Sequence, residues 1–331
     1  MPRPLTGSAD DQGQAGPHAD DLRKPAQPAD VFQARIGRLE RVFDLGSVLS
    51  RGRTSREVIS YYNQSSLGYH ILHSREGAIH MALNPDGIFS PEGYGRAAQL
   101  VMRQFPEDVE SRILELGCGR GYNIASIARA YPACTVLGID IVPRHVKRAL
   151  RATRDLPNAT AQLGDFERMP YEDGSFDVLY SIESFCHTLN LPGAFAEARR
   201  VSRLGTRFIV IDAWRTDKSG RLPAGSRRAV ELLEASMSVG NVRTRKSWLH
   251  EAAQQGWQLC GITPLSAEVL PNLERFESWS KKFLKWPWLA RAVRHIGPSK
   301  LWQNAIAGYL MAESVRQSVH SYDIIVLEAR A

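Results

Sequence analysis

Four acidic residues stand where short apolar runs of the chain end: Glu115, Asp140, Asp165 and Glu183. Each run has the length and composition of a buried parallel strand. The carboxyl ends of such strands meet at one edge of an open sheet, where ligands bind. A single acid in that position caps the next helix about as often as it binds a ligand. Four in succession predict a polar site for a cationic or hydroxyl-bearing ligand.

A glycine-rich turn follows the first of these runs, in residues 112–123 with the sequence RILELGCGRGYN. Its glycines, Gly117, Gly119 and Gly121, allow a tight turn and let a ligand lie against the main chain. A dinucleotide site would carry its third glycine at position 122, where this chain has Tyr122. The acid before the turn would also repel a pyrophosphate, whereas it attracts an ammonium group. The pattern therefore favours S-adenosylmethionine, which carries an ammonium group.

The remaining strand ends suit the rest of that nucleoside. Asp140 ends the second run, where a carboxylate binds both ribose hydroxyls. Asp165 and Phe166 suit the amine and the face of an adenine. The expected cofactor site consists of Glu115, Gly117, Gly119, Gly121, Asn123, Asp140, Ile141, Asp165, Phe166 and Ile182.

The order of these motifs resembles that of the class I S-adenosylmethionine-dependent methyltransferases. The resemblance covers residues 107–214 and rests on E-L-G-C-G-R-G, G-I-D, G-D-F and F-D-V-L-Y-S-I-E-S-F-C-H. It implies an α/β, Rossmann-like fold with a seven-stranded, mostly parallel sheet and helices on both faces. N-terminal helices and a C-terminal helical insertion would form a cap. The chain departs from the family before the fifth strand, where R-L-G-T-R replaces a structural L-K-P-G-G turn.

Three further segments look like the sterol side-chain methyltransferases and the bacterial prenyl diphosphate C-methyltransferases. They read S-I-E-S-F-C-H-T-L-N-L, V-I-D-A-W-R-T-D-K and, upstream, Y-Y-N-Q-S-S-L-G-Y-H-I-L-H-S. The resemblance implies methylation of an alkene carbon of an isoprenoid such as farnesyl or geranyl diphosphate, through a carbocation that is deprotonated or cyclised. A sterol-like lipid is an alternative acceptor. A second alternative is O- or N-methylation of a small natural-product metabolite. A binding protein without turnover is a third class, against which the intact acids argue.

Glu183 is the expected base, because it matches the family's acid beyond the fourth strand and a carboxylate both stabilises a cation and accepts its proton. His187 shares that task if the segment turns helically. Tyr62 is expected to cover the methyl donor from the N-terminal segment. The cofactor is S-adenosyl-L-methionine, with Mg²⁺ as a further candidate beside a diphosphate. No metal ligands are assigned, since His70, His73 and Arg75 have no metal-site spacing.

A candidate lid lies in the C-terminal part of the chain. Its aromatic residues recur at helical spacing from Phe276 to Trp286. Such a stripe is more often a packing face. Above the sheet, however, it would stabilise a cation and exclude water. The expected substrate contacts are Tyr61, Tyr69, His70, Phe185, Trp279, Phe283 and Trp286.

The chain of 331 residues, 43% of them hydrophobic, is long enough for one large α/β domain with a helical cap. We expect a disordered arm (1–29), an N-terminal helical cap (30–106), the nucleoside domain (107–265), a helical insertion or lid (266–321) and a last strand (322–331). No apolar run reaches 18 residues, and the N-terminus lacks a signal-peptide core. We therefore expect a cytoplasmic protein without stable membrane insertion. Its four cysteines without paired spacing fit a reducing compartment.

The net charge of +7 raises the question of a nucleic-acid partner. Methyltransferases of base amines resemble N-P-P-Y or D-P-P-Y where this chain has S-I-E-S, and its basic residues are spread out. We therefore expect a small hydrophobic isoprenoid as partner and no nucleic acid. The sequence leaves a homo-oligomer open.

Overall fold

The computed structural model describes residues 28–50, 54–68, 73–74, 76–105, 111–239, 242–296 and 298–331. Most of the expected disordered arm lies outside these ranges, and so do Tyr69, His70 and Arg75. The helix expected near Val31 is α1 (Pro28–Glu40).

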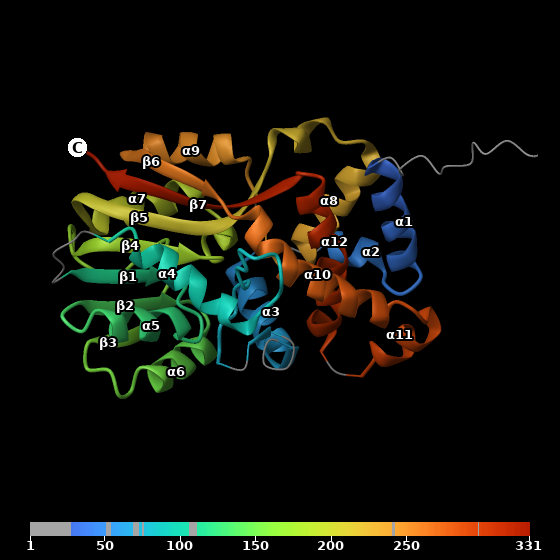
Figure 1. Ribbon diagram of the computed structural model, residues 1–331, viewed down its shortest axis with the longest axis horizontal. Helices are drawn as coiled ribbons and strands as arrows, with labels where there is room; N and C mark the ends of the chain where they lie inside the picture. The colour runs from blue at the N-terminus through green and yellow to red at the C-terminus, as the bar shows by residue number, and fades with distance from the viewer. Residues whose placement is uncertain are drawn as a thin grey trace, which may run out of the picture.

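A seven-stranded sheet in the order β3-β2-β1-β4-β5-β7-β6 forms the centre of the structure (Figure 1). Only β7 runs antiparallel to its neighbours, β5 and β6. This topology confirms the predicted class I fold with its mostly parallel sheet. The strands are β1 (Arg112–Leu116), β2 (Thr135–Asp140), β3 (Ala159–Leu163), β4 (Phe176–Ile182), β5 (Ser202–Arg215), β6 (Trp257–Pro264) and β7 (His320–Ala329).

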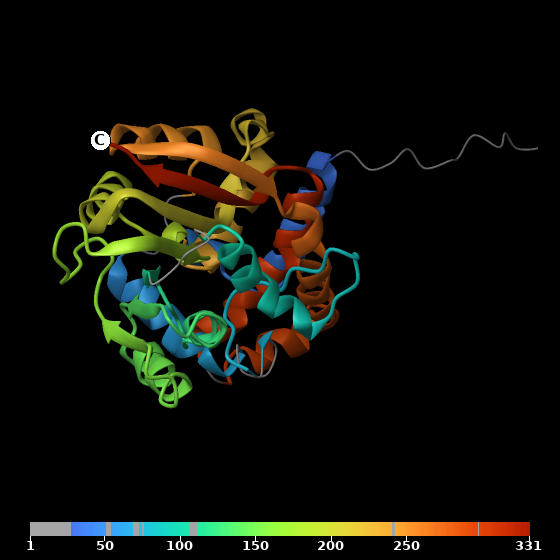
Figure 2. The same ribbon diagram turned by 60° about the vertical axis from the view of Figure 1, so that its left-hand side comes forward.

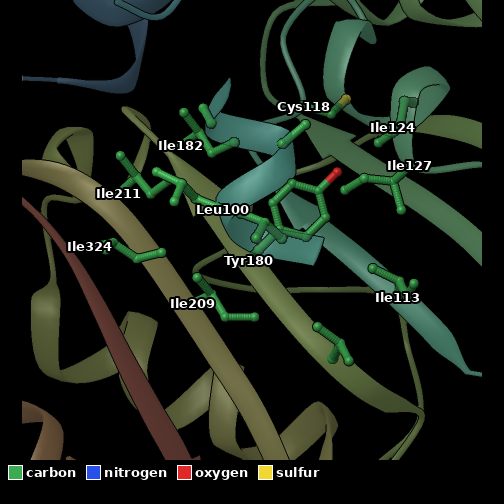
Figure 3. Packing of buried hydrophobic residues seen from close by; sticks show 14 of the residues in the cluster. Leu100, Ile113, Cys118, Ile124, Ile127, Tyr180, Ile182, Ile209, Ile211 and Ile324 are labelled. Atoms are coloured by element: carbon green, nitrogen blue, oxygen red, sulfur yellow. The ribbon is translucent and has the colours of Figure 1, made fainter. Parts of the chain in front are cut away.

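Helices cover both faces of the sheet. The apolar side chains of α4 (Arg96–Met102), α5 (Tyr122–Ala130) and α6 (Pro143–Ala152) pack on one face. Those of α7 (Leu191–Val201) and α9 (Arg245–Gln254) pack on the other. Figure 3 shows Tyr180 of β4 among isoleucines of neighbouring strands and helices. The central strands are apolar on both faces, which is the pattern of strands buried between two helical layers.

A separate group of helices lies at one end of the sheet (Figures 1 and 2). It contains α1, α2 (Leu45–Leu49), α3 (Ser55–Gly68), α8 (Ala224–Ser236), α10 (Ser266–Phe283), α11 (Pro287–Val293) and α12 (Ser299–Arg316). The sequence predicted its N-terminal and C-terminal parts. It assigned α8 to the nucleoside domain, but Leu232 and Leu233 pack in the same cluster as Phe32 of α1 and Leu310 of α12. The cap therefore draws on three separate stretches of the chain.

The short 3₁₀ turns are η2 (Pro91–Gly95), η3 (Phe185–His187) and η4 (Asp217–Arg221). The R-L-G-T-R segment that departs from the family pattern lies within β5 as a bulge. Pairing with β4 there jumps from Ser202 to Arg207, and Gly205 has a φ of +81°. The bulge takes the place of the turn that was expected before this strand.

Candidate active site

Two cavities meet at the carboxyl ends of the parallel strands. The first, of about 640 Å³, lies over the glycine-rich turn, and the second, of about 880 Å³, lies between the sheet and the helical cap. Four residues line both cavities: Tyr62, Ile79, Glu183 and His187. The three expected catalytic residues are thus gathered at the junction.

Asp140 holds the glycine-rich turn against the end of β2. Its Oδ2 accepts the N–H of Gly119 and its Oδ1 accepts the N–H of Val142, both at 2.8 Å. These bonds satisfy two buried donors at the floor of the first cavity. Asp140 therefore positions the turn as well as presenting a carboxylate to the cavity.

The glycines of the turn are required by close packing. A Cβ on Gly117, at a φ of +77°, would lie 2.3 Å from the Cβ of Ser184. A Cβ on Gly121, at a φ of +83°, would lie 2.7 Å from the Cα of Ala149 in α6. Gly121 does not line the first cavity. Its expected contact with the cofactor stays a prediction, and its close packing on Ala149 joins helices α5 and α6.

Glu115 is a buried carboxyl group beneath the turn. Asn123 donates Nδ2–H to its Oε1 at 3.0 Å, and Tyr180 donates its hydroxyl to Oε2 at 3.1 Å. Burial nevertheless raises the pKa of Glu115 to about 8, against the opposing effect of these bonds. A cation in the first cavity would favour the charged form. The ammonium and sulfonium of S-adenosylmethionine fit that requirement.

Glu183 follows β4 directly and has a φ of +50°, which is unusual for a residue with a side chain. Its Oε1 accepts the backbone N–H of Met81 at 2.7 Å and the hydroxyl of Tyr322 at 2.5 Å. Burial raises the pKa of Glu183 to about 7, although both hydrogen bonds oppose the shift. The strained backbone thus aims a carboxyl group that ionises near neutral pH at the junction.

His187 ends η3 and is joined to helix α3. Its Nδ1 lies 3.3 Å from the carbonyl oxygen of Ser238, which can only accept, so Nδ1 carries the proton. Nε2 then accepts the hydroxyl proton of Tyr62 at 3.0 Å. Burial lowers the pKa of His187 and raises that of Tyr62 well above its ordinary value. Both side chains are therefore neutral at the junction.

The second cavity is mostly apolar, with a cluster of polar groups along one side. Val269 and Leu273 of α10 and Met311 and Val315 of α12 form part of its wall. The polar residues are Asp212, Glu234, Ser314, His320 and Ser321, together with Glu183, His187 and the tyrosines. No Lys or Arg occurs among the described residues that line it.

Asp212 lies near the end of β5. Its Oδ2 accepts the N–H of Cys186 at 3.0 Å, and its Oδ1 accepts the N–H of Ala213 at 2.8 Å. Burial raises the pKa of Asp212 to about 6, while the hydrogen bonds oppose the shift. Asp212 is a buried carboxyl group beside the second cavity.

The buried Glu234 forms an ion pair with the half-buried Arg215, whose Nε and Nη2 lie 2.7 and 2.6 Å from the two carboxylate oxygens. Burial would raise the pKa of Glu234, but hydrogen bonds from His320 and Arg215 lower it overall. The Nε2 of His320 lies 3.2 Å from Oε1 of Glu234, so this nitrogen donates to the carboxylate. Nδ1 of His320 is buried and has no hydrogen-bond partner among the described residues.

Most of the expected cofactor residues line the first cavity. They are Glu115, Gly117, Gly119, Asn123, Asp140, Ile141, Phe166 and Ile182. Asp165 lies outside its lining, where its carboxylate accepts the N–H of Glu167 at 2.9 Å. Among the expected substrate contacts, Tyr61 lines the second cavity.

The other described aromatic residues of the expected set, Phe185, Trp279, Phe283 and Trp286, are not among the residues that line either cavity. Phe185 is buried in the core and stacks on Phe166, with ring centroids 5.6 Å apart. Trp279 packs under the guanidinium of Arg275, and Phe283 stacks on Trp302. Trp286 is 54% exposed. The stripe is a packing face because α10 turns these side chains toward other helices and solvent, while Val269 and Leu273 face the cavity.

Several residues of the site were missed by sequence reasoning. Asp212 carries the same signal as the four acids that were selected, an acid near the carboxyl end of an apolar strand. His80 gave no signal, yet its Nε2 lies 3.2 Å from Oδ1 of Asn123 at the first cavity. Tyr322 and His320 lie on alternate positions of β7 and so face the same side of the sheet. Their roles depend on tertiary contacts that a sequence does not contain.

The comparisons with known proteins agree with this architecture. Residues 114–210 match the methyltransferase domain family. The chain is 30% identical to a sterol methyltransferase-like protein of Botryococcus braunii, over 59% of this chain and 52% of the relative. It is 27% identical to the sterol 24-C-methyltransferase of Saccharomyces cerevisiae, over 50% of this chain and 43% of the relative. The chain thus spans about half the length of these curated relatives.

A solved structure of similar fold is the geranyl diphosphate C-methyltransferase of Streptomyces coelicolor A3(2), in complex with Mg²⁺, geranyl diphosphate and S-adenosyl-L-homocysteine. The TM-score is 0.62 at 17% identity, and the match covers 83% of this chain and 97% of the other. A likeness at this identity concerns the fold alone. The matched domain identifies residues 114–210 as a methyltransferase domain, and the likeness shows that its fold is that of the class I enzymes.

Proposed function

We propose that the protein is an S-adenosylmethionine-dependent C-methyltransferase that acts on an alkene carbon of an uncharged isoprenoid lipid. The observation that carries this proposal is the position of Glu183, a half-buried residue whose carboxyl group is shared by the two cavities. A base at that point lies between a methyl donor in the first cavity and an acceptor in the second.

The first cavity supplies the groups that the cofactor needs. Asp140 would bind the ribose hydroxyls, Phe166 would contact the adenine, and Glu115 would face the methionine part. When bound there, S-adenosylmethionine supplies an electrophilic methyl group on a sulfonium. Its binding would also relieve the cost of charging Glu115, because a nearby cation favours the carboxylate.

The junction supplies the groups that an alkene acceptor needs. Methylation of an alkene carbon leaves a positive charge on the acceptor, which then loses a proton. The carboxylate of Glu183 would stabilise that charge and accept that proton. The neutral faces of Tyr62 and His187 would exclude water and contact the cation. Transfer to oxygen or nitrogen requires less of this environment.

An uncharged acceptor fits the second cavity better than a prenyl diphosphate does. A diphosphate would face the carboxyl groups of Glu183 and Asp212 without a Lys or Arg among the described lining residues. The charge of Glu234 is already compensated by Arg215. Like charges repel each other more strongly when they are buried, because the interior of a protein screens them less than water does. The geometry therefore favours the sterol-like alternative over the diphosphate that the sequence put first.

His320 suggests that the acceptor carries a hydroxyl group. Because Nε2 donates to Glu234, Nδ1 is left without a partner among the described residues, at a residue that lines a largely apolar cavity. A hydroxyl group can pair with this nitrogen in either protonation state of the ring, because a hydroxyl both donates and accepts. A buried polar atom without a partner is costly, and a ligand hydroxyl would satisfy it. Sterols and terpenoid alcohols carry that group on an apolar frame.

The test is incubation with methyl-labelled cofactor and matched acceptors: farnesol and farnesyl diphosphate, geraniol and geranyl diphosphate, and a sterol with an unsaturated side chain. We expect carbon-bound label in an uncharged acceptor, detected by mass spectrometry of the products. Labelling of the diphosphates alone would refute the uncharged acceptor. Label on oxygen would instead support O-methylation, for which the neutral His187 would be the base.

A further inference from the structure

The segment that joins α10 to α12 carries an unusual exposed apolar surface. Trp286, Trp288, Leu289 and Ile296 are 54%, 68%, 44% and 71% exposed. Residues 281–296 are called the α11 surface below. Single exposed apolar residues are common, but a cluster with two tryptophans marks an interaction site.

The α11 surface is also strongly basic. Between Glu277 and Glu313 the sequence contains no acidic residue, while the α11 surface contains Lys281, Lys282, Lys285, Arg291 and Arg294. Of these, Lys281 is paired with Glu277. Lys285 lies over the ring of Trp286, with its Nζ 5.6 Å from the ring centroid. Lys282 and Lys285 are exposed. Charge and aromatic side chains therefore occupy the same face.

The surface is held in a fixed orientation by its inward residues. Leu284 and Ala290 are 1% and 2% exposed and pack in the apolar cluster of the helical cap. Trp302 donates its indole N–H to the carbonyl oxygen of Ile296 at 2.9 Å. The tryptophans of α11 are thus exposed because the cap fixes the opposite side of the segment, at the outer edge of the molecule (Figure 1).

We infer that the α11 surface docks the protein on anionic membranes. Tryptophan and basic side chains together are the composition of elements that lie in the membrane interface, with rings at the headgroup level and cations on anionic lipids. Within the described residues, no helix is long and apolar enough to cross a bilayer. The contact is therefore peripheral, with α11 lying on the surface.

The placement of this surface suits an enzyme with a lipid acceptor. Helices α10 and α12 wall the second cavity through Leu273 and Met311 and carry the α11 surface at their other ends. From Leu273 to Leu284 the helix spans about 16 Å at 1.5 Å per residue. Docking would hold the second cavity close to the bilayer that contains the acceptor. This consequence rests on the proposed function, whereas the docking itself does not.

The test is flotation of the full chain with vesicles of phosphatidylcholine, with or without phosphatidylserine, in the absence of cofactor and isoprenoid. We expect binding to the anionic vesicles that weakens as salt rises. Lys282→Gln with Lys285→Gln should weaken it by roughly fivefold per charge removed. Trp286→Ser with Trp288→Ser should abolish it. Matched controls are Lys147→Gln with Arg129→Gln, and Leu204→Ser with Leu259→Ser, all exposed positions elsewhere.

Equal binding of the α11 variants and the controls would overturn the inference, and so would no binding by the unchanged protein. Sedimentation without vesicles tests the other possible partner of this surface, which is a second copy of the chain. A dimer that becomes monomeric in Trp286→Ser with Trp288→Ser, without vesicle binding, would assign the surface to self-association. Because the vesicles contain no acceptor, a failure of the proposed methylation leaves this result unchanged.

Discussion

Tyr322, near the start of β7, donates its hydroxyl proton to Oε1 of Glu183, just beyond β4, at 2.5 Å. The backbone N–H of Met81 donates to the same oxygen at 2.7 Å. Burial raises the pKa of Glu183 to about 7, and both bonds limit that rise because they favour the charged form. The carboxyl group is therefore held in place by two partners and poised to accept a proton at neutral pH.

Glu183→Gln should lower turnover by roughly 100-fold or more, the scale expected when a general base is lost. The amide keeps the shape of the side chain and still accepts from Tyr322, so S-adenosylhomocysteine affinity should stay unchanged in calorimetry. Products should include altered alkene isomers, because a cation without its base survives longer. Turnover and products like those of the unchanged protein would remove Glu183 from the reaction and favour His187 or Tyr62.

Tyr322→Phe should move the pH dependence of the reaction upward. In the unchanged protein kcat/KM should rise as Glu183 ionises, through its pKa of about 7. Loss of the tyrosine donor removes a bond that favours the charged form, so the rising limb should shift to higher pH, by about one unit for a charged hydrogen bond. An unshifted limb would mean that another group titrates. Tyr94→Phe, whose hydroxyl donates to the carbonyl oxygen of His73, is the matched control.

Local sequence patterns were enough to predict the first cavity. Glu115 and Asp140 lie at the ends of apolar strands on either side of a glycine-rich turn, and these elements follow one another within one short stretch of the sequence. The positions of these residues in the sequence are therefore enough to place them together, since parallel strands end at one edge of the sheet. Even here nothing local in the sequence shows that Gly121 also lies against Ala149 of another helix.

The second cavity could not be predicted in the same way. His320 and Glu234 meet across a gap of 86 residues in sequence, and Leu273 and Met311 face the cavity from different helices. Helical spacing showed that α10 carries an aromatic face, but spacing alone does not tell which face meets the sheet. The inward face proved to be aliphatic, as suits an apolar acceptor.

Asp140→Ala should weaken S-adenosylhomocysteine binding by about 2 kcal/mol, the scale of charged hydrogen bonds. The change removes the expected ribose contact. It also removes the carboxylate that accepts hydrogen bonds from the N–H groups of Gly119 and Val142. Titration calorimetry would measure the affinity, and Asp155→Ala, an exposed carboxylate, is the control. Equal affinity in both variants would exclude Asp140 from the cofactor site.

His320→Leu should raise KM for a hydroxylated acceptor and leave KM for the corresponding hydrocarbon unchanged. A hydrogen bond to a neutral group is worth about 1 kcal/mol, or roughly fivefold in KM. The comparison of farnesol with farnesene separates this effect from a general loss of packing. A parallel rise for both compounds would show that His320 supports the cavity without recognising a hydroxyl.

Glu115→Gln should stabilise the free protein at pH 8 while it weakens cofactor binding. The native pKa of Glu115 is about 8, well above the ordinary value of 4.5, so the fold favours the protonated form. Its contribution to stability is fully present below pH 4.5 and is lost as pH rises toward 8. Glutamine is neutral throughout, so the melting temperature should fall less over this window in the variant. The amide of Asn123 can rotate so that its oxygen accepts from the introduced glutamine amide and its NH₂ donates to Nε2 of His80.

The measurement is the melting temperature from pH 5 to pH 8, with and without S-adenosylhomocysteine, for the unchanged protein, Glu115→Gln and the exposed control Glu172→Gln. The free variant should be the most stable of the three at pH 8, and the ligand should raise its melting temperature least. Identical pH slopes in all three proteins would mean that Glu115 ionises in the free fold without cost. A full ligand-induced rise in the variant would mean that the bound cation does not depend on this carboxylate.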